Sequence, residues 1–186
     1  LAGVAGASAK SDNSLTVDGG SEVIFGGNVS AANISVTAGS ITQNETAGSI
    51  ITTSLDATAN SGISLDSTNN QIRKARLINK LSGNILLKNK SVLELTLMEN
   101  IGRSASIINA GNLVVGGNIF AKGLSLDCTS LIQNVSTGKI KVGELTVNSI
   151  NGMSLAAASN EIDRARLVNM TKGNIELRTS SHLDLA

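Results

Sequence analysis

The chain has 186 residues, 19 of them glycine, with no proline, tryptophan or tyrosine, only two phenylalanines and a formal net charge of +1. Globular domains of this size normally fill their cores with aromatic side chains, so here small aliphatic side chains must form a thin core. No stretch approaches the roughly 20 apolar residues of a membrane span, and we expect no membrane insertion. The single cysteine, Cys128, excludes a disulfide framework or a thiolate metal site.

Short runs with an apolar residue at every second position follow one another along the chain, separated by Gly, Asn and Ser. A period of two is typical of strands with one buried face, and no stretch sustains a helical period. Residues 1–13 lack this pattern, and we predict an irregular N-terminal segment there. The alternation predicts that the following side chains are buried: Ile34, Val36, Ile63, Leu65, Ile85, Leu87, Leu93 and Leu95.

A long internal repeat organises the rest of the chain. Residues 23–96 recur without a gap as residues 113–186, and 27 of the 74 paired positions are identical. A repeat of this kind is built by stacking one unit on the next. Within the first copy, Ile41, Ile63 and Ile85 are 22 residues apart. A second series, Ile34, Leu55, Leu77 and Leu97, has members that are 20 to 22 residues apart.

Sub-repeats of roughly 20–22 residues with several short strands predict a parallel β-helix of about nine coils, with residues 14–186 as a single solenoid. A β-sandwich is the alternative, although a sandwich does not require a repeat with a constant offset. A propeller fits less well, because its blades are longer and usually carry aromatic signatures.

Asparagine residues are retained between the two copies at five positions. Asparagine tolerates left-handed turns, and an asparagine turned inward can bond its neighbour one coil further on. We therefore predict turn or ladder roles for ten residues: Asn28, Asn44, Asn70, Asn79, Asn84, Asn118, Asn134, Asn160, Asn169 and Asn174.

Six bases and no acid lie between residues 71 and 90 of the first copy: Arg73, Lys74, Arg76, Lys80, Lys88 and Lys90. Such a cluster can bind a polyanion, but solvated charges on a rod are commoner, and no aromatic residues are interleaved to stack bases. We expect no nucleic-acid partner. Arg76 and Arg166 are retained in both copies, and we expect both to point outward, four coils apart.

The residue types of an enzyme are scattered. His182 is the only histidine and pairs with Val92 of the first copy, while Asp66 pairs with Ala156 and Cys128 with Ala38. A lone histidine without a matched nucleophile makes no triad. We expect no catalytic site, metal or cofactor, and we expect Cys128 to be a small buried filler. A polysaccharide-active β-helix enzyme is the least favoured of three functional classes.

The segment 62–95, with Gly-Ile-Ser-Leu-Asp-Ser-Thr-Asn-Asn-Gln-Ile, Ala-Arg-Leu-Ile-Asn and Gly-Asn-Ile-Leu-Leu-Lys-Asn, resembles the repeats of filamentous haemagglutinin-type exoproteins. The tetrapeptide Ser-Ile-Thr-Gln at 40–43, partly retained at 130–133, is also similar. The resemblance covers nearly the whole chain from about residue 14 and implies the shaft of a long right-handed parallel β-helix. The Asn-Pro-Asn-Gly turn of the secretion domain is absent, and no catalytic residue carries over.

The resemblance implies a protein secreted by a partner protein across a bacterial outer membrane, and a location outside the cell or at its surface. The expected function is the structural shaft of an adhesin. The competing class is an extracellular filament or sheath assembled end to end. Expected partners are neighbouring repeats of a longer chain or further copies of this one, with surface receptors or polysaccharide as possible ligands.

Overall fold

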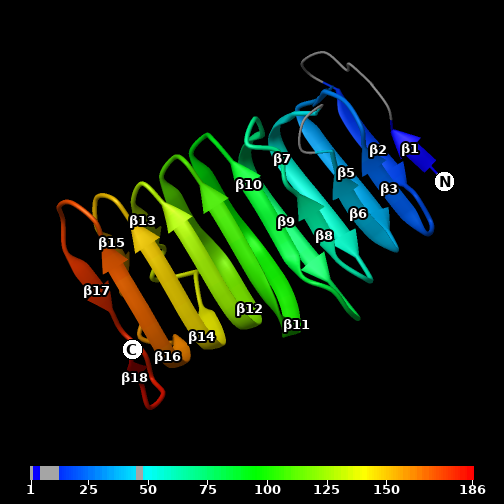
Figure 1. Cartoon of the computed structure of the whole chain (residues 1–186). Coiled ribbons are helices and arrows are strands. Elements are labelled where there is room, and N and C mark those ends of the chain that lie inside the picture. Colours follow the sequence, from blue (N-terminus) through cyan, green and yellow to red (C-terminus); the bar gives the residue numbers. More distant parts are fainter. Residues whose placement is uncertain (1, 5–12, 45–47) are drawn as a thin grey trace.

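The computed structural model describes residues 2–4, 13–44 and 48–186. Within them the chain is all β, has no helix, and forms a solenoid of about eight coils. Every pairing between its strands is parallel, and the strands follow one another along one axis, with the termini at opposite ends (Figure 1). The predicted parallel β-helix is confirmed, whereas the β-sandwich is excluded.

The strands are short where a coil has two or three separate segments, and long where one strand bends around a corner. They are β1 (Ala2–Val4), β2 (Ser14–Asp18), β3 (Glu22–Phe25), β4 (Val29–Ser30), β5 (Asn33–Ala38), β6 (Ser40–Gln43), β7 (Ile50–Ala59), β8 (Ile63–Leu65), β9 (Gln71–Asn79), β10 (Ile85–Asn89), β11 (Leu93–Asn109), β12 (Leu113–Cys128), β13 (Leu131–Gln133), β14 (Ile140–Ser149), β15 (Met153–Leu155), β16 (Glu161–Asn169), β17 (Ile175–Leu177) and β18 (Asp184–Leu185).

The N-terminal segment that we expected to be irregular contains β1. This strand pairs in parallel with β3, with Ala2 opposite Val23. The backbone pairing to β3 explains why a segment without clear alternation becomes a strand. The residues between β1 and Asn13 lie outside the described part of the chain.

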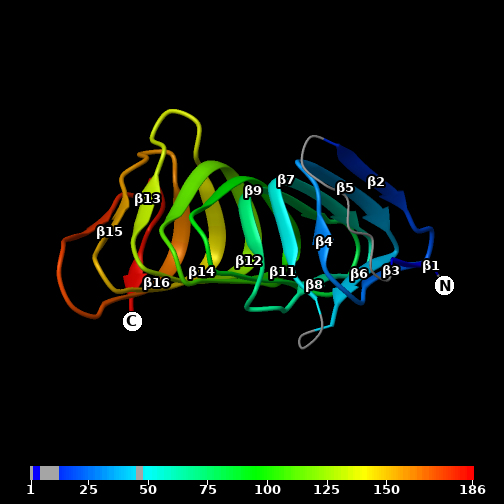
Figure 2. The ribbon, with the colours of Figure 1, turned by 90° about the horizontal axis from the view of Figure 1, so that it is seen from above.

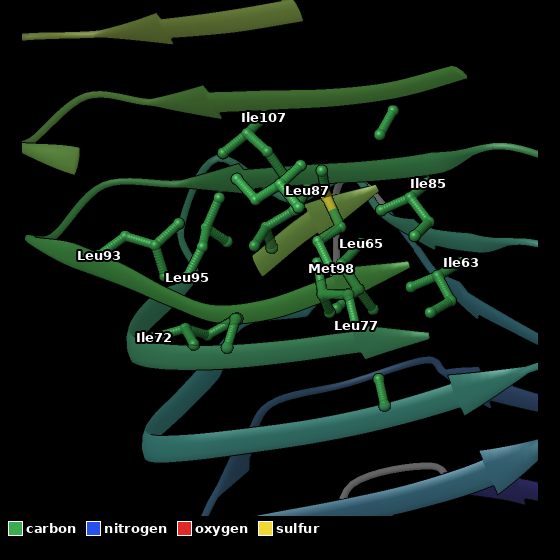
Figure 3. Packing of buried hydrophobic residues seen from close by; sticks show 14 of the residues in the cluster. Ile63, Leu65, Ile72, Leu77, Ile85, Leu87, Leu93, Leu95, Met98 and Ile107 are labelled. Carbon is green, nitrogen blue, oxygen red and sulfur yellow. The ribbon is translucent and has the colours of Figure 1, made fainter. Parts of the chain in front are cut away.

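The core is a single cluster of mainly aliphatic side chains inside the coils. All eight side chains predicted to be inside are buried, and Figure 3 shows six of them packed with Leu77, Met98 and Ile107. The predicted sub-repeat of Ile34, Leu55, Leu77 and Leu97 is out of register at its last two members, because Leu55 pairs with Ala75 and Leu77 pairs with Ala57. A bulge between Leu95 and Leu97 shifts the register, so Met98, and not Leu97, pairs with Leu77 and is buried.

Two rows of strands run along the solenoid in the first copy. Row I consists of β5, β7, β9 and the first part of β11, and row II consists of β6, β8 and β10. The second copy has the same internal pairing. The second part of β12 pairs with β14 and then β16, while β13 pairs with β15 and then β17.

The two copies nevertheless exchange rows where they join. Row II of the first copy continues through β11 into the second part of β12, which is the sequence equivalent of β5 in row I. Row I divides as it continues into β12. Leu95 leads through Val115 into β13, the equivalent of β6 in row II, while Met98 leads through Ile119 into Ile140 at the start of β14, the equivalent of β7. Ninety residues are therefore four coils and part of a fifth. Figure 2 shows that the coils of both copies wrap around a common interior.

The register shows the exchange residue by residue. Starting at Ile34, successive partners are Leu55, Ala75, Leu95 and Val115. The sequence equivalent of Ile34 is instead Leu124, whose partner in the preceding coil is Ala105, and that of Ala105 is Ile85. Arg76 and Arg166 consequently lie in different rows. Both side chains point outward, but they do not stand on the same face of the rod.

One turn is built identically in both copies. The Asn79 side-chain amide donates hydrogen bonds to the carbonyls of Ser82 and Gly83, at 2.8 and 3.1 Å, and Asn169 does the same to Lys172 and Gly173. Gly83 has a φ of 79°, a backbone conformation that favours glycine. The retained Asn-x-x-x-Gly pattern thus sets the turn that follows row I.

Candidate functional site

The most regular polar site is a buried pair of side-chain amides. Gln43 donates to Asn70 through Nε2, and Asn70 donates back through Nδ2, both at 2.9 Å. Asn70 also accepts from the Ile50 amide at 2.8 Å and donates to the Lys88 carbonyl at 3.1 Å. Buried amides without partners would be costly, and these partners lie on successive coils. The pair therefore holds neighbouring coils in register.

The second copy repeats this pair. Gln133 donates to Asn160 at 2.7 Å, and Asn160 returns a hydrogen bond at 3.0 Å. The Ile140 amide and the Arg178 carbonyl take the places of those of Ile50 and Lys88. Since both sets of contacts survive the exchange of rows, the pair belongs to the 90-residue unit and not to one side of the rod.

Asparagine ladders connect further coils. Asn79 accepts from the Gly62 amide and donates to Asn100, both at 2.8 Å, and Asn89 donates to Asn109 at 2.9 Å. In the second copy Asn169 accepts from the Gly152 amide at 2.9 Å. The Asn79–Asn100 and Asn89–Asn109 bonds join side chains one coil apart, and the other two join a side chain to a backbone amide, so their role is to hold the chain in register.

The other predicted asparagines lie at the surface and do not form one site. Asn28 accepts from the Ser49 amide at 3.0 Å, and Asn84 accepts from the Ser104 amide at 3.3 Å, each on the next coil. Asn134 instead closes a local turn with Ser136. Three predicted positions remain, and all are exposed: Asn44, Asn118 and Asn174.

The sequence analysis did not predict five residues of these hydrogen-bond ladders: Gln43, its copy Gln133, Asn89, Asn100 and Asn109. The signal was the alternation itself. Gln43 stands two residues after the buried Ile41, and Asn89 two residues after the buried Leu87, so both point inward.

The structure divides the basic cluster. Lys74 and Arg76 lie on β9 in row I, Lys88 lies on β10 in row II, and Lys80 and Lys90 lie beyond the strand ends. Three of the six bases are neutralised. Their ion pairs are Lys74–Glu94 at 3.0 Å, Arg76–Asp56 at 2.8 Å and Lys88–Asp66. The cluster is continuous in sequence but not on one face of the rod.

The second copy carries a different ion-pair network. Glu161 contacts Lys139 at 2.5 Å and Lys141 at 2.7 Å. Hydrogen bonds from these two ammonium groups lower the pKa of Glu161 from 4.5 to about 2, and the pKa of Lys141 is raised in return. The first copy has Gln71, Ser49 and Ile51 at the corresponding positions, so this network is not part of the repeat.

The three residues with catalytic chemistry lie apart. Cys128 is buried, and burial, assisted by the neighbouring Asp127, raises the pKa of its thiol to about 12. The protonated thiol packs in the core as a small side chain. His182 is exposed beside Asp184, and Asp66 is paired with Lys88. Across 2–4, 13–44 and 48–186, no three His, Cys, Asp or Glu side chains gather to hold a metal.

A groove of about 670 Å³ runs along the outside of row II and its continuation. It crosses β6, β8, β10, β11, β12 and β14. We call it the hydroxyl groove, because its outward side chains are mainly Ser and Thr: Ser40, Thr42, Ser61, Ser64, Ser104, Ser106, Ser125 and Thr146. It spans the junction of the two copies, and the exchange of rows brings Ser125 and Thr146 of the second copy into line with it.

No family model, curated protein or solved structure matches the chain. The fold therefore rests on the structure itself. In the described part of the chain, no helix is long and apolar enough to cross a membrane.

Proposed function

We propose that this chain is part of the structural shaft of a secreted or surface-displayed bacterial adhesin. The shaft would be a long, rigid spacer that holds other parts of an adhesive protein away from the cell surface. The proposal combines the solenoid fold with the resemblance of its repeats to filamentous haemagglutinin-type exoproteins.

The observation that carries the proposal is the continuity of the strand ladder through the junction between the copies. β11 and β12 are the longest strands, of 17 and 16 residues, and each contributes to both rows where the rows are exchanged. No linker separates the units, so they act as one body. At about 4.8 Å per coil, eight coils give a rod of roughly 38 Å, and each further 90-residue unit adds about 20 Å.

The interior supports rigidity as well as length. Side-chain amides bond from coil to coil at Gln43–Asn70, Asn79–Asn100 and Gln133–Asn160, so bending would break buried hydrogen bonds. A rod with this interior can act as a rigid spacer, and further copies of the 90-residue unit would lengthen the rod with the same strand pairing.

Location and length test the proposal separately. An antibody against the purified chain should label intact cells of the source bacterium, and labelling only after permeabilisation would contradict the surface location.

Deletion of residues 34–123 joins equivalent positions of the two copies. X-ray scattering should then show a folded rod shorter by about 20 Å.

The second candidate is end-to-end assembly into a filament or sheath. The stacking itself favours it, because the pairing between coils is parallel and each coil presents the next one with the same kind of strand edge. An open strand edge with apolar side chains is a template for another chain. Rods that lengthen in steps with protein concentration under the electron microscope would support assembly. Monomers at every concentration would exclude it for this chain.

A further inference from the structure

We infer that the hydroxyl groove is a binding site for an extended, neutral polysaccharide that runs along the axis of the rod. This inference goes beyond the proposed shaft, because a spacer needs no ligand on its side. It also holds if the shaft proposal fails, since it depends on the groove alone.

The groove is ordered along the axis by the parallel register. One outward column contains Thr42, Ser64, Leu86, Ser106, Ser125 and Thr146, each the partner of the next. Successive coils place a side chain about every 4.8 Å, so the six positions cover about 24 Å. A ligand that uses all of them must be extended and must lie across the strands, parallel to the axis.

The hydroxyl groups of this column are available to a ligand. In the described part of the chain, none of its five Ser and Thr hydroxyls makes a hydrogen bond to protein. Two hydroxyls outside the groove are occupied: Ser154 donates to Glu176 at 2.9 Å, and Thr96 donates to the Ala75 carbonyl at 3.1 Å. A free hydroxyl both donates and accepts, which matches the hydroxyl groups of a sugar.

Charge restricts the class of ligand. The only charged residue in the lining is Glu144, which is paired with Arg164 at 3.2 Å, while Asn84 adds an amide. The column ends at Ile24 on one side and Arg166 on the other. A polyanion would find no row of cations here, whereas a neutral polyol would lose no ionic hydration on binding.

The backbone of the groove cannot capture a peptide as an added strand, because β6, β8 and β10 are each paired on both sides. Only side chains face the ligand, and the outward Leu86 gives one apolar contact. No aromatic side chain lines the groove, so a single sugar ring gains no stacking energy. Affinity must then come from several coils acting together, and it should rise steeply with ligand length.

The repeat supplies matched controls. Ser125 lies in the groove and its sequence equivalent Ser35 lies in row I outside it; Ser64 and Ser154 form a second such pair. All four are outward strand positions, so replacement by arginine fills the groove at Ser64 or Ser125 without entering the core. Thermal melting of each variant shows whether the fold is retained.

The experiment is titration of the full chain with maltohexaose, cellohexaose, mannohexaose and their disaccharides, followed by nuclear magnetic resonance. We expect at least one hexasaccharide to shift groove resonances and to bind at least ten-fold more tightly than its disaccharide. Ser125→Arg and Ser64→Arg should weaken that binding at least ten-fold, and Ser35→Arg and Ser154→Arg should not.

Several results would overturn the inference: no binding by any of the three hexasaccharides at millimolar concentration, equal losses in the groove and control variants, or larger shifts of the groove resonances with a heparin hexasaccharide than with the neutral ones. None of them bears on rod length or cell-surface labelling, so failure of this inference is distinguishable from failure of the shaft proposal.

Discussion

The two copies of the 74-residue repeat have the same internal strand pairing and yet occupy different sides of the rod. β7 pairs with β5 and β9, just as β14 pairs with β12 and β16, but row I of one copy is stacked on row II of the other. A sequence period is therefore not a structural period. The unit that duplicated is about four coils and part of a fifth, and each junction rotates its surfaces.

This difference separates two kinds of retained residue. Core and ladder residues, such as Leu65 and Asn70, have equivalent surroundings in both copies because their partners lie mainly within the unit. Surface residues such as Ser35 and Ser125 have different neighbours, because the exchange of rows changes what stands beside them. Interior contacts should respond alike to mutation in the two copies, and surface contacts should not.

The largest effect is expected from a charge in the core. Leu65 and its equivalent Leu155 are fully buried, so Leu65→Asp and Leu155→Asp should each prevent folding or cost several kcal/mol. Circular dichroism melting measures the loss, with the outward Ser64→Asp as a control that should melt nearly like the wild type. If Leu65→Asp kept the wild-type melting temperature, the assignment of inner and outer faces would be reversed.

A smaller effect is expected at the buried amide pairs. Gln43→Leu removes both hydrogen bonds to Asn70 and should lower the free energy of unfolding by about 1–3 kcal/mol. Gln133→Leu should give a similar loss, since Asn160 has the same contacts. Urea unfolding provides the measurement, and Gln71→Leu is the exposed control. A large loss in one copy with none in the other would disprove the equivalence of the pairs.

The acid response should differ between the copies. The pKa of Glu161 is lowered to about 2 in the folded chain, so its ion pairs stabilise the fold above pH 4.5 and are lost as the pH falls to 2. Glu161→Gln should flatten the dependence of the melting temperature on pH in this window. Gln71→Glu places a carboxylate at the equivalent position without the two lysines and should add no such stabilisation. Identical pH profiles for wild type and Glu161→Gln would contradict this assignment.

The smallest effect is expected from the basic cluster. Three of its six bases are paired with acids and the cluster is divided between two rows, so heparin should bind weakly or not at all at physiological salt. Heparin-affinity chromatography of the whole chain is the measurement, and substitution of Arg73, Lys80 and Lys90 by Gln should leave elution unchanged. Salt-sensitive, submicromolar binding that these substitutions abolish would make the cluster a binding site.

The sequence by itself determined the all-β class, the solenoid and most of the core. Alternation and a repeat with a constant offset report local periodicity and stacking, which depend on neighbours along the chain and one coil away. The same alternation identified Ile63, Leu65, Ile85 and Leu87 as buried, and read more strictly it would have placed Gln43 and Asn89 inside as well.

Only the tertiary structure decided how the copies face one another and which surface residues meet. The bulge after Leu95 and the fraction of a coil left over in 90 residues shift the register where the copies join, and neither is visible in a pattern of polarity. Side chains far apart in sequence, from Ser40 to Thr146, therefore share one groove, while the bases from Arg73 to Lys90 are separated. A periodic pattern specifies which side chains point outward, but the fraction of a coil left over in each 90-residue unit determines the face on which they stand.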